Sequence, residues 1–376
     1  MNHDLTPEHL KAWSLATRGP WPSPNGSGSD ADWMALALQE ATRGVGLSSP
    51  NPPVGCVITK EGRLVGRGVH LQAGQPHAEV VAIQHALSAG EDLQGATAYI
   101  TLEPCCHSGR TPPCTEALIQ AGIQRVVLGA RDLNPRVNGG GIAILTSAGV
   151  EVATGVLAEE CIRFHEPFFK WVQTGLPWVT AKLALGDKRS VGVHEQVTDP
   201  TTQALSHALR RVSDGILVGG ETIRVDNPQL TDRWPPVAEA HRRFHRIVMI
   251  GHRPIDDQAA VWTFQPREPL IRISTRRLPA REQISDIIVP PDPQGRPSLP
   301  HTLAELGARH VTRLLLEGGP TLITQALHHH LVDEIHIFES TRSVSGPTFP
   351  PLGPTWKERG AYTLGSDAWK IFSLGA

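Results

Sequence analysis

The chain has 376 residues, of which 40% are hydrophobic and 19% charged, the balance of an ordinary globular protein. This length exceeds one typical domain core, so we expect two domains or three. A net charge of −2 provides no overall basic field, which argues against nucleic acid or a membrane surface as partner. Five cysteines without an apolar leader or membrane-length apolar run favour a metal-binding, cytoplasmic protein.

Turn-forming residues dominate positions 1–30, which we predict to be a flexible extension. Asp32 is a candidate cap for the first helix. Strands are then expected over residues 54–59, 64–69, 96–102, 125–129 and 150–152, with helices over 77–87 and 114–121 and a short one before the last strand. The alternation predicts an α/β layer architecture for a domain over residues 31–155.

A connecting helix and linker over residues 156–176 lead to a second α/β series, for which we predict a domain over 177–376. Strands are expected over residues 178–185, 215–218, 246–250, 270–274, 312–316 and 334–338, and helices over 200–212, 302–306 and 320–327. The second half shows no internal repeat of the first.

One histidine and two cysteines carry the clearest chemistry. His77 begins a predicted helix, Cys105 follows a predicted strand through Pro104, and Cys114 begins another helix. A catalytic zinc takes three such ligands and leaves one position for water, whose pKa it lowers to about 7. Glu79, two residues after the histidine, can take the water's proton and pass it to the ring and the departing amine. Zinc-dependent nucleobase deaminases have this arrangement.

Other interpretations of the cysteines stay open. Cys106 and His107 are alternative ligands, but Cys105 directly follows the proline, so we prefer it and interpret Cys106 as a packing residue. Cys56 and Cys161 are expected to be buried thiols. A purely structural zinc module would need a fourth protein ligand.

The cysteine spacing departs from the common deaminase pattern. Eight residues separate Cys105 from Cys114 instead of two, and they include His107 and Arg110, donors suited to an anionic or polar substrate. This spacing and the near-neutral charge argue against the alternative of a nucleic-acid-editing deaminase.

His77-Ala-Glu-Val, Thr101-Leu-Glu-Pro-Cys-Cys-His-Ser-Gly-Arg-Thr-Pro-Pro-Cys114 and Asn51-Pro-Pro-Val-Gly-Cys-Val resemble the bifunctional deaminase and reductase of riboflavin biosynthesis. The resemblance covers residues 33–155 and implies a cytidine-deaminase-like three-layer domain. The substrate would be a diamino-hydroxypyrimidine attached to ribosylamine 5-phosphate. The resemblance implies zinc ligands at His77, Cys105 and Cys114, a catalytic proton shuttle at Glu79, and a substrate contact at Asn51, which could equally be an ordinary turn residue.

The second half resembles the same family through residues 214–233 and 314–322. This implies a dihydrofolate-reductase-like α/β domain that uses NADPH to reduce the ribose to ribitol. The resemblance places substrate contacts at Arg210, Leu230, Arg233 and Glu317, and cofactor contacts at Ala184, Thr222, Asp226, Gly318 and Gly319. Independently, two glycines between a strand and a helix let backbone amides approach a phosphate.

Two segments depart from the family pattern. Residues 182–189 replace a Ser-Leu-Asp-Gly stretch, and residues 194–198 replace Ser-x-Trp-Ile-Thr. The leading hypothesis is a bifunctional enzyme with Zn²⁺ and NADPH as cofactors; the alternative is a deaminase with a degenerate, non-catalytic reductase-like domain. The expected partner is a small phosphorylated pyrimidine, with no nucleic acid and no membrane, and the resemblance also implies a homo-oligomer.

Overall fold

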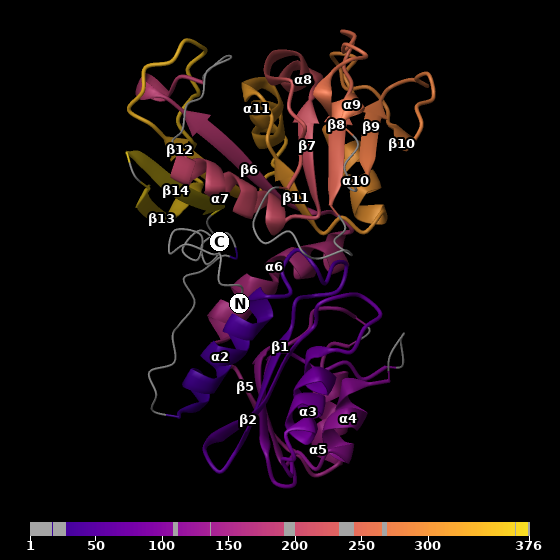
Figure 1. Cartoon of the computed structure of the whole chain (residues 1–376), viewed down its shortest axis with the longest axis vertical. Helices are drawn as coiled ribbons and strands as arrows, with labels where there is room; N and C mark the ends of the chain where they lie inside the picture. Colours follow the sequence, from indigo (N-terminus) through magenta and orange to yellow (C-terminus); the bar gives the residue numbers. More distant parts are fainter. Residues whose placement is uncertain are drawn as a thin grey trace. The chain divides into compact units, whose positions relative to one another are not determined.

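The computed structural model describes residues 17, 28–107, 112–135, 137–191, 200–232, 244–264, 269–364 and 366–374. The chain divides into two compact units, and the boundary lies between Gly175 and Leu176 (Figure 1). Each unit has its own β-sheet. Most of the predicted extension over residues 1–30 lies outside the described residues.

The first unit contains a five-stranded sheet in the order β2-β1-β3-β4-β5. Its strands are β1 (Gly55–Lys60), β2 (Arg63–Val69), β3 (Thr97–Leu102), β4 (Arg125–Ala130) and β5 (Glu151–Thr154). Its helices are α2 (Asp30–Thr42), α3 (Ala78–Ser88), α4 (Cys114–Gln120), α5 (Gly140–Ser147) and α6 (Ala158–Thr174). Strand β1 is antiparallel to both neighbours, whereas β3, β4 and β5 are parallel.

Helices cover both faces of this sheet. Side chains along a strand alternate between the two faces, so neighbouring residues of β3 contact different helices. On one face the Tyr99 hydroxyl donates to Asp30 of α2 and Thr101 contacts His165 of α6. On the other face Ile100 belongs to a core cluster with residues of α3, α4 and α5. The predicted three-layer architecture is confirmed.

The first helix begins earlier than we expected. Ser29 is its N-cap: the Ser29 hydroxyl accepts from the Asp32 amide at 3.3 Å, and the Asp32 carboxylate accepts from the Ser29 amide at 3.1 Å. Asp32 is therefore the third residue of a reciprocal capping box and not the cap, so that prediction was wrong.

Close approach of α3 to the sheet depends on two glycines of β2. A Cβ atom on Gly68 would lie 2.3 Å from the Ala78 carbonyl oxygen and 2.5 Å from the Ala82 amide nitrogen. One on Gly66 would lie 2.5 Å from the Ala82 carbonyl oxygen. The backbone at the start of α3 therefore packs directly on the strand, which places His77 and Glu79 at the sheet.

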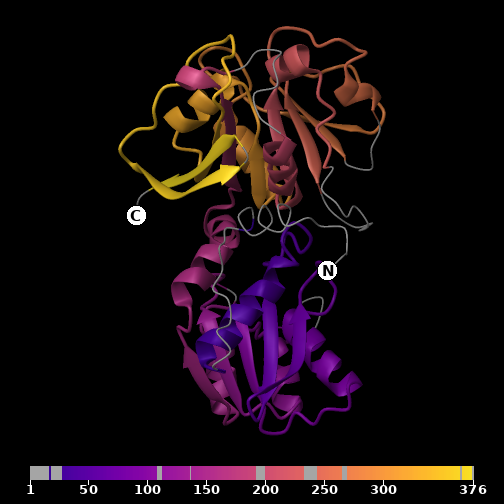
Figure 2. The same cartoon turned by 60° about the vertical axis from the view of Figure 1, so that its left-hand side comes forward.

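The second unit contains a nine-stranded sheet in the order β10-β9-β8-β7-β11-β6-β12-β14-β13. Its two C-terminal strands, β13 and β14, are the pair of yellow arrows in Figure 2. Its strands are β6 (Trp178–Leu185), β7 (Gly215–Gly219), β8 (His245–Met249), β9 (Leu270–Ser274), β10 (Ile284–Ile288), β11 (Arg313–Leu316), β12 (Glu334–Glu339), β13 (Trp356–Leu364) and β14 (Asp367–Leu374). Its helices are α7 (Pro200–Arg211), α8 (Gly220–Asp226), α9 (Ala260–Thr263), α10 (Leu299–Ala308) and α11 (Pro320–His328).

Seven neighbouring strands, β10 through β12, are parallel, and β14 and β13 extend the sheet in antiparallel fashion. The sequence predictions found six of the strands and missed β10, β13 and β14. The sequence of β14 does not alternate cleanly between apolar and polar residues, because its buried positions include Asp367 and Ser373 together with Trp369 and Ile371. Among the described residues, no helix is long and apolar enough to span a membrane.

Replacing Gly68 with Ala tests the packing of α3. The added methyl would overlap the α3 backbone, so we expect the first unit to lose about 1–3 kcal/mol of unfolding free energy. The matched control is Gly353→Ala, where a Cβ atom meets nothing within 4 Å. Thermal unfolding and zinc content of both variants provide the measurement, and equal unfolding midpoints would contradict the close packing.

Candidate functional site

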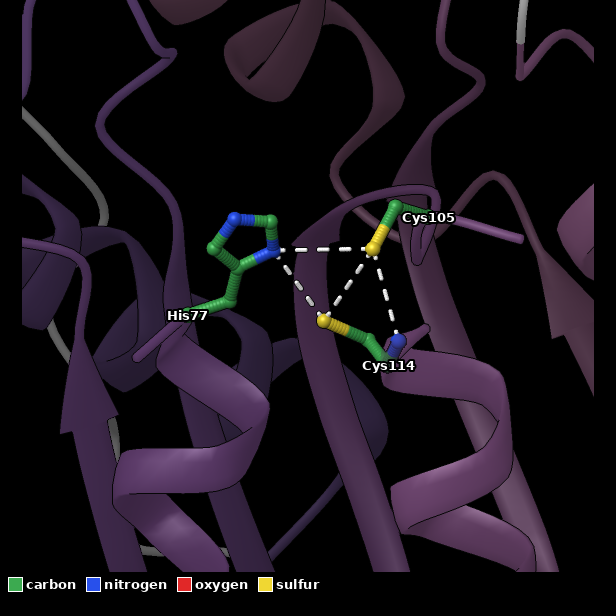
Figure 3. A group of neighbouring side chains, drawn as sticks. All are labelled: His77, Cys105 and Cys114. Carbon is green, nitrogen blue, oxygen red and sulfur yellow. Dashed lines mark hydrogen bonds between the residues drawn. The ribbon is translucent and has the colours of Figure 1, made fainter. Parts of the chain in front are cut away.

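His77, Cys105 and Cys114 meet beyond the carboxyl end of β3, the central strand of the first sheet (Figure 3). His77 is the N-cap of α3 and makes no capping hydrogen bond with its side chain. Cys105 follows β3, and Cys114 is the first residue of α4. The His77 Nδ1 atom lies 3.2 Å from the Cys114 sulfur and 3.5 Å from the Cys105 sulfur, and the two sulfurs are 3.4 Å apart.

This donor set fits a zinc ion. A tetrahedral ion with bonds of about 2.0–2.3 Å separates its ligand atoms by roughly 3.3–3.8 Å, close to the spacing here. One imidazole nitrogen and two sulfurs are donors that zinc prefers. Within the described ranges, neither Cys106 nor His107 belongs to a potential metal-binding group, and three ligands leave a position open.

The local electrostatics favour a thiolate at Cys105. Hydrogen bonding with the Cys114 thiol lowers the pKa of Cys105 to about 4, against the effect of burial, and His77 and the Cys114 amide contribute in the same direction. That amide donates to the Cys105 sulfur at 3.4 Å. A thiolate is the form of cysteine that binds metal.

Glu79 lies in the first turn of α3 and is only 3% exposed. Burial raises the pKa of its carboxyl group, the nearby Cys105 raises it further, and His77 opposes both. A carboxylate in such surroundings takes up a proton more readily than one at the surface, which suits a group that must accept and return a proton.

Asn51 adjoins the zinc-ligand group through a residue that the sequence reasoning missed, His70. The His70 Nδ1 atom lies 3.1 Å from the Pro76 carbonyl oxygen, so Nδ1 donates and Nε2 accepts from the Asn51 amide nitrogen at 3.0 Å. Burial lowers the pKa of His70 to about 4, so its ring is neutral near pH 7. The ring centres of His70 and His77 are 4.9 Å apart.

Two predicted substrate residues of the second unit form a buried ion pair. The Arg210 guanidinium donates to the Glu317 carboxylate at 3.2 and 2.8 Å, and both side chains are largely buried. Arg210 also donates to the Thr231 carbonyl oxygen at 3.0 Å, next to the buried Leu230, whose φ is 59°. Arg233 lies outside the described residues.

Lys182 joins this cluster although no role was predicted for it. Burial lowers the pKa of Lys182, while the charge of Glu317 opposes that shift and Arg210 adds to it. Its ammonium group lies 5.9 Å from the centre of the Phe338 ring. The sequence contained one sign of this: Lys182 lies within the apolar run of β6, and a lysine is rarely buried unless an oppositely charged group is nearby.

The predicted cofactor residues lie on neighbouring elements. Gly319 is the N-cap of α11, and its amide donates to the Thr222 hydroxyl at 3.3 Å. At Gly318 a Cβ atom would lie 2.8 Å from the Cδ2 atom of Leu322, so that side chain would have to shift to admit one. Asp226 ends α8, and Ala184 lies on β6 opposite Phe338 of β12.

Known families match both halves of the chain. Residues 27–130 match the cytidine and deoxycytidylate deaminase zinc-binding region, and residues 187–367 match the RibD C-terminal domain. Riboflavin biosynthesis protein RibD of Escherichia coli strain K12 is 36% identical over 329 residues, which cover 82% of this chain and 87% of that protein. RibD of Aquifex aeolicus is 37% identical over 313 residues, or 82% and 86% of the two chains.

Solved structures agree with these matches. A diaminohydroxyphosphoribosylaminopyrimidine deaminase/5-amino-6-(5-phosphoribosylamino)uracil reductase of Thermotoga maritima superposes with a TM-score of 0.81 at 30% identity, covering 92% of this chain and 99% of that one. RibD of Acinetobacter baumannii gives a TM-score of 0.80 at 29% identity with the same coverage. None of these findings favours a deaminase alone. The chain therefore belongs to the RibD family and is a bifunctional enzyme of riboflavin biosynthesis, in which a zinc-dependent deaminase domain precedes an NADPH-dependent reductase domain.

Proposed function

We propose that the chain deaminates 2,5-diamino-6-(5-phosphoribosylamino)pyrimidin-4-one and then reduces the ribosyl group of the product to a ribityl group. The grouping of His77, Cys105 and Cys114 beside the buried Glu79 carries the first half of this proposal. The name of the Thermotoga maritima relative, which states both activities, supports the substrate assignment.

In the deaminase domain, His77, Cys105 and Cys114 hold the zinc ion. Bound zinc would lower the pKa of a water molecule to about 7. Glu79 would accept one proton from the attacking water and pass it to the ring nitrogen, and would then carry the second proton from the added hydroxyl group to the amine. A ring C–O bond thereby replaces the C–N bond, and ammonia leaves. The Asn51 side chain contacts the pyrimidine, in an orientation that its hydrogen bond with the neutral His70 maintains.

In the reductase domain, Arg210, Leu230, Arg233 and Glu317 bind the substrate, and Ala184, Thr222, Asp226, Gly318 and Gly319 bind the cofactor. NADPH, when bound, supplies the two electrons of the reduction. Lys182 adds a positive charge beside Glu317 and can donate a hydrogen bond to a sugar oxygen. Support comes from the Arg210–Glu317 pair and the hydrogen bond from the Gly319 amide to Thr222.

We propose a cytoplasmic enzyme that acts on a small phosphorylated pyrimidine and not on nucleic acid, and that forms a homo-oligomer. The net charge of −2 supports a small substrate, because polynucleotide binding relies on a basic surface. Sedimentation of the purified chain would establish the number of subunits.

Incubation of the purified chain with the pyrimidine tests both activities at once. Without NADPH we expect the product mass to rise by about one unit, as an amino group becomes a carbonyl, and ammonia to appear in equal amount. With NADPH we expect a further gain of two hydrogens and matching oxidation of the cofactor. Deamination without any cofactor oxidation would instead support a non-catalytic second domain.

Replacing Glu79 with Gln should lower the rate of ammonia release by about 10²–10⁴-fold, because the amide cannot carry the proton. Zinc should remain near one ion per chain, since Glu79 is outside the ligand group. The control is Glu61→Gln, in an exposed turn between β1 and β2. Turnover of the Glu79 variant at the control's rate would exclude this role.

Replacing Arg210 with Met should change the pH dependence of the reductase. Burial alone would raise the pKa of Glu317, but the charges of Arg210 and Lys182 lower it from 4.5 to about 2. The ionised Glu317 therefore stabilises the wild-type fold above pH 4.5, and this contribution is lost as the pH falls through about 2. Without the charge and the hydrogen bonds of Arg210, we expect the pKa of Glu317 to rise.

The acidic limb of the kcat/KM profile of the reductase should consequently move to higher pH in the Arg210 variant. The deaminase profile of the same protein provides the control, because its residues belong to the other unit. An unchanged acidic limb would show that Glu317 does not titrate in the reductase reaction.

A further inference from the structure

Glu103, between β3 and the ligand Cys105, has no role in the proposed reaction, yet it is buried with 4% of its surface exposed. Four backbone amides donate to its carboxylate. Oε1 accepts from Gly141 at 3.1 Å and Ile142 at 3.2 Å, and Oε2 accepts from Gly139 at 3.0 Å and Asp132 at 3.4 Å. Each oxygen atom therefore accepts two hydrogen bonds from the backbone.

The glycine-rich stretch of the sequence is what allows this contact. Gly139 has a φ of 81°, which favours glycine. A Cβ atom on Gly141 would lie 2.3 Å from the Pro104 carbonyl oxygen, and one on Gly140 would lie 2.7 Å from the Cys106 sulfur. The backbone before and at the start of α5 thus packs directly on the segment that contains the zinc ligand Cys105.

The topology places this loop beside the zinc-ligand group. Strands β3 and β4 are parallel neighbours, and the Glu103 amide donates to the Ala130 carbonyl oxygen at 3.0 Å where both strands end. Ligands of open α/β sheets bind outside the carboxyl ends of such strands. The segment after β3 carries Cys105, and the segment after β4 begins at Arg131 and continues through Asp132.

Asp132 gives a second sign of this proximity. The pKa of its carboxyl group is raised to about 6, chiefly by burial and in smaller part by the nearby Glu103 and Cys105. The loop after β4 therefore approaches the segment that contains Cys105 at two places, at Asp132 and at residues 139–141.

We infer that Glu103 is a positioning residue that holds Asp132 and Gly139, the two ends of the loop after β4, as one side of the substrate site. This inference rests on the proposed deaminase function. Replacing Glu103 with Gln keeps the side-chain shape but points an amide NH₂ at two N–H donors, whereas Glu103→Asp keeps both oxygen atoms on a shorter side chain. If the carboxylate anchors the loop, the Glu103→Asp variant must retain more deaminase activity than the Glu103→Gln variant.

Steady-state deamination by the full-length protein tests this inference. For Glu103→Gln we expect the KM for the pyrimidine to rise at least about tenfold, because two anchoring bonds are lost and replaced by repulsion. Zinc should stay near one ion per chain, and the reductase rate of the same protein should not change. Gly141→Ala should have a similar effect that is less than additive with Glu103→Gln, because both detach one loop. The exposed Glu159→Gln is the matched control.

Amide hydrogen exchange provides a readout that does not depend on the substrate. The amides of Gly139, Gly141 and Ile142 should exchange faster in Glu103→Gln than in the wild type. An unchanged exchange rate would refute the anchoring role, and faster exchange with an unchanged KM would remove the loop from the substrate site. Zinc loss in parallel with activity would instead assign Glu103 to the metal ligands. If the wild type does not deaminate the pyrimidine, the proposed substrate fails while the exchange experiment still tests the anchor.

Discussion

The direct packing of the α3 backbone on β2 is the constraint on which the deaminase site depends. Gly66 and Gly68 have no side chains to separate the helix from the strand, so the start of α3 has a defined position relative to the sheet. The ligand residue His77 lies at that start together with Glu79, which is not a ligand. The other two ligand residues are Cys105, which follows β3, and Cys114, which begins α4. Three ligand atoms can meet within bonding distance of one ion only if these backbone ends are held to within a fraction of an ångström.

Two buried carboxylates illustrate how neighbours give the same side chain opposite properties. Burial raises the pKa of both Glu79 and Glu317. Glu79 faces the negative sulfur of Cys105 and keeps a raised pKa, which suits a group that transfers protons. Glu317 faces Arg210 and Lys182, which reverse the effect of burial and keep it ionised, as suits a fixed hydrogen-bond acceptor.

The sequence predicted the elements near both sites better than those at the end of the chain. Parallel strands such as β7 and β8 are buried on both faces and appear as continuous apolar runs, which are easy to identify. Strand β13 is mostly exposed, and the partly exposed β10 lies at the other edge of the sheet, so neither has such a run. The helix cap at Ser29 was missed because Ser29 and Asp32 are both good caps, and only their reciprocal hydrogen bonds distinguish them.

The sequence alone indicated zinc chemistry for the first domain, because His77, Glu79, Cys105 and Cys114 lie in short motifs that are recognisable without the fold. It also implied the reductase fold through longer stretches of resemblance. Only the tertiary structure brought Asn51 to His70, Glu103 to Gly139, and Arg210 to Glu317, which are 19, 36 and 107 residues apart in the chain. These contacts depend on strand pairing and helix packing, and residue types alone do not specify which distant buried groups will satisfy one another's hydrogen bonds.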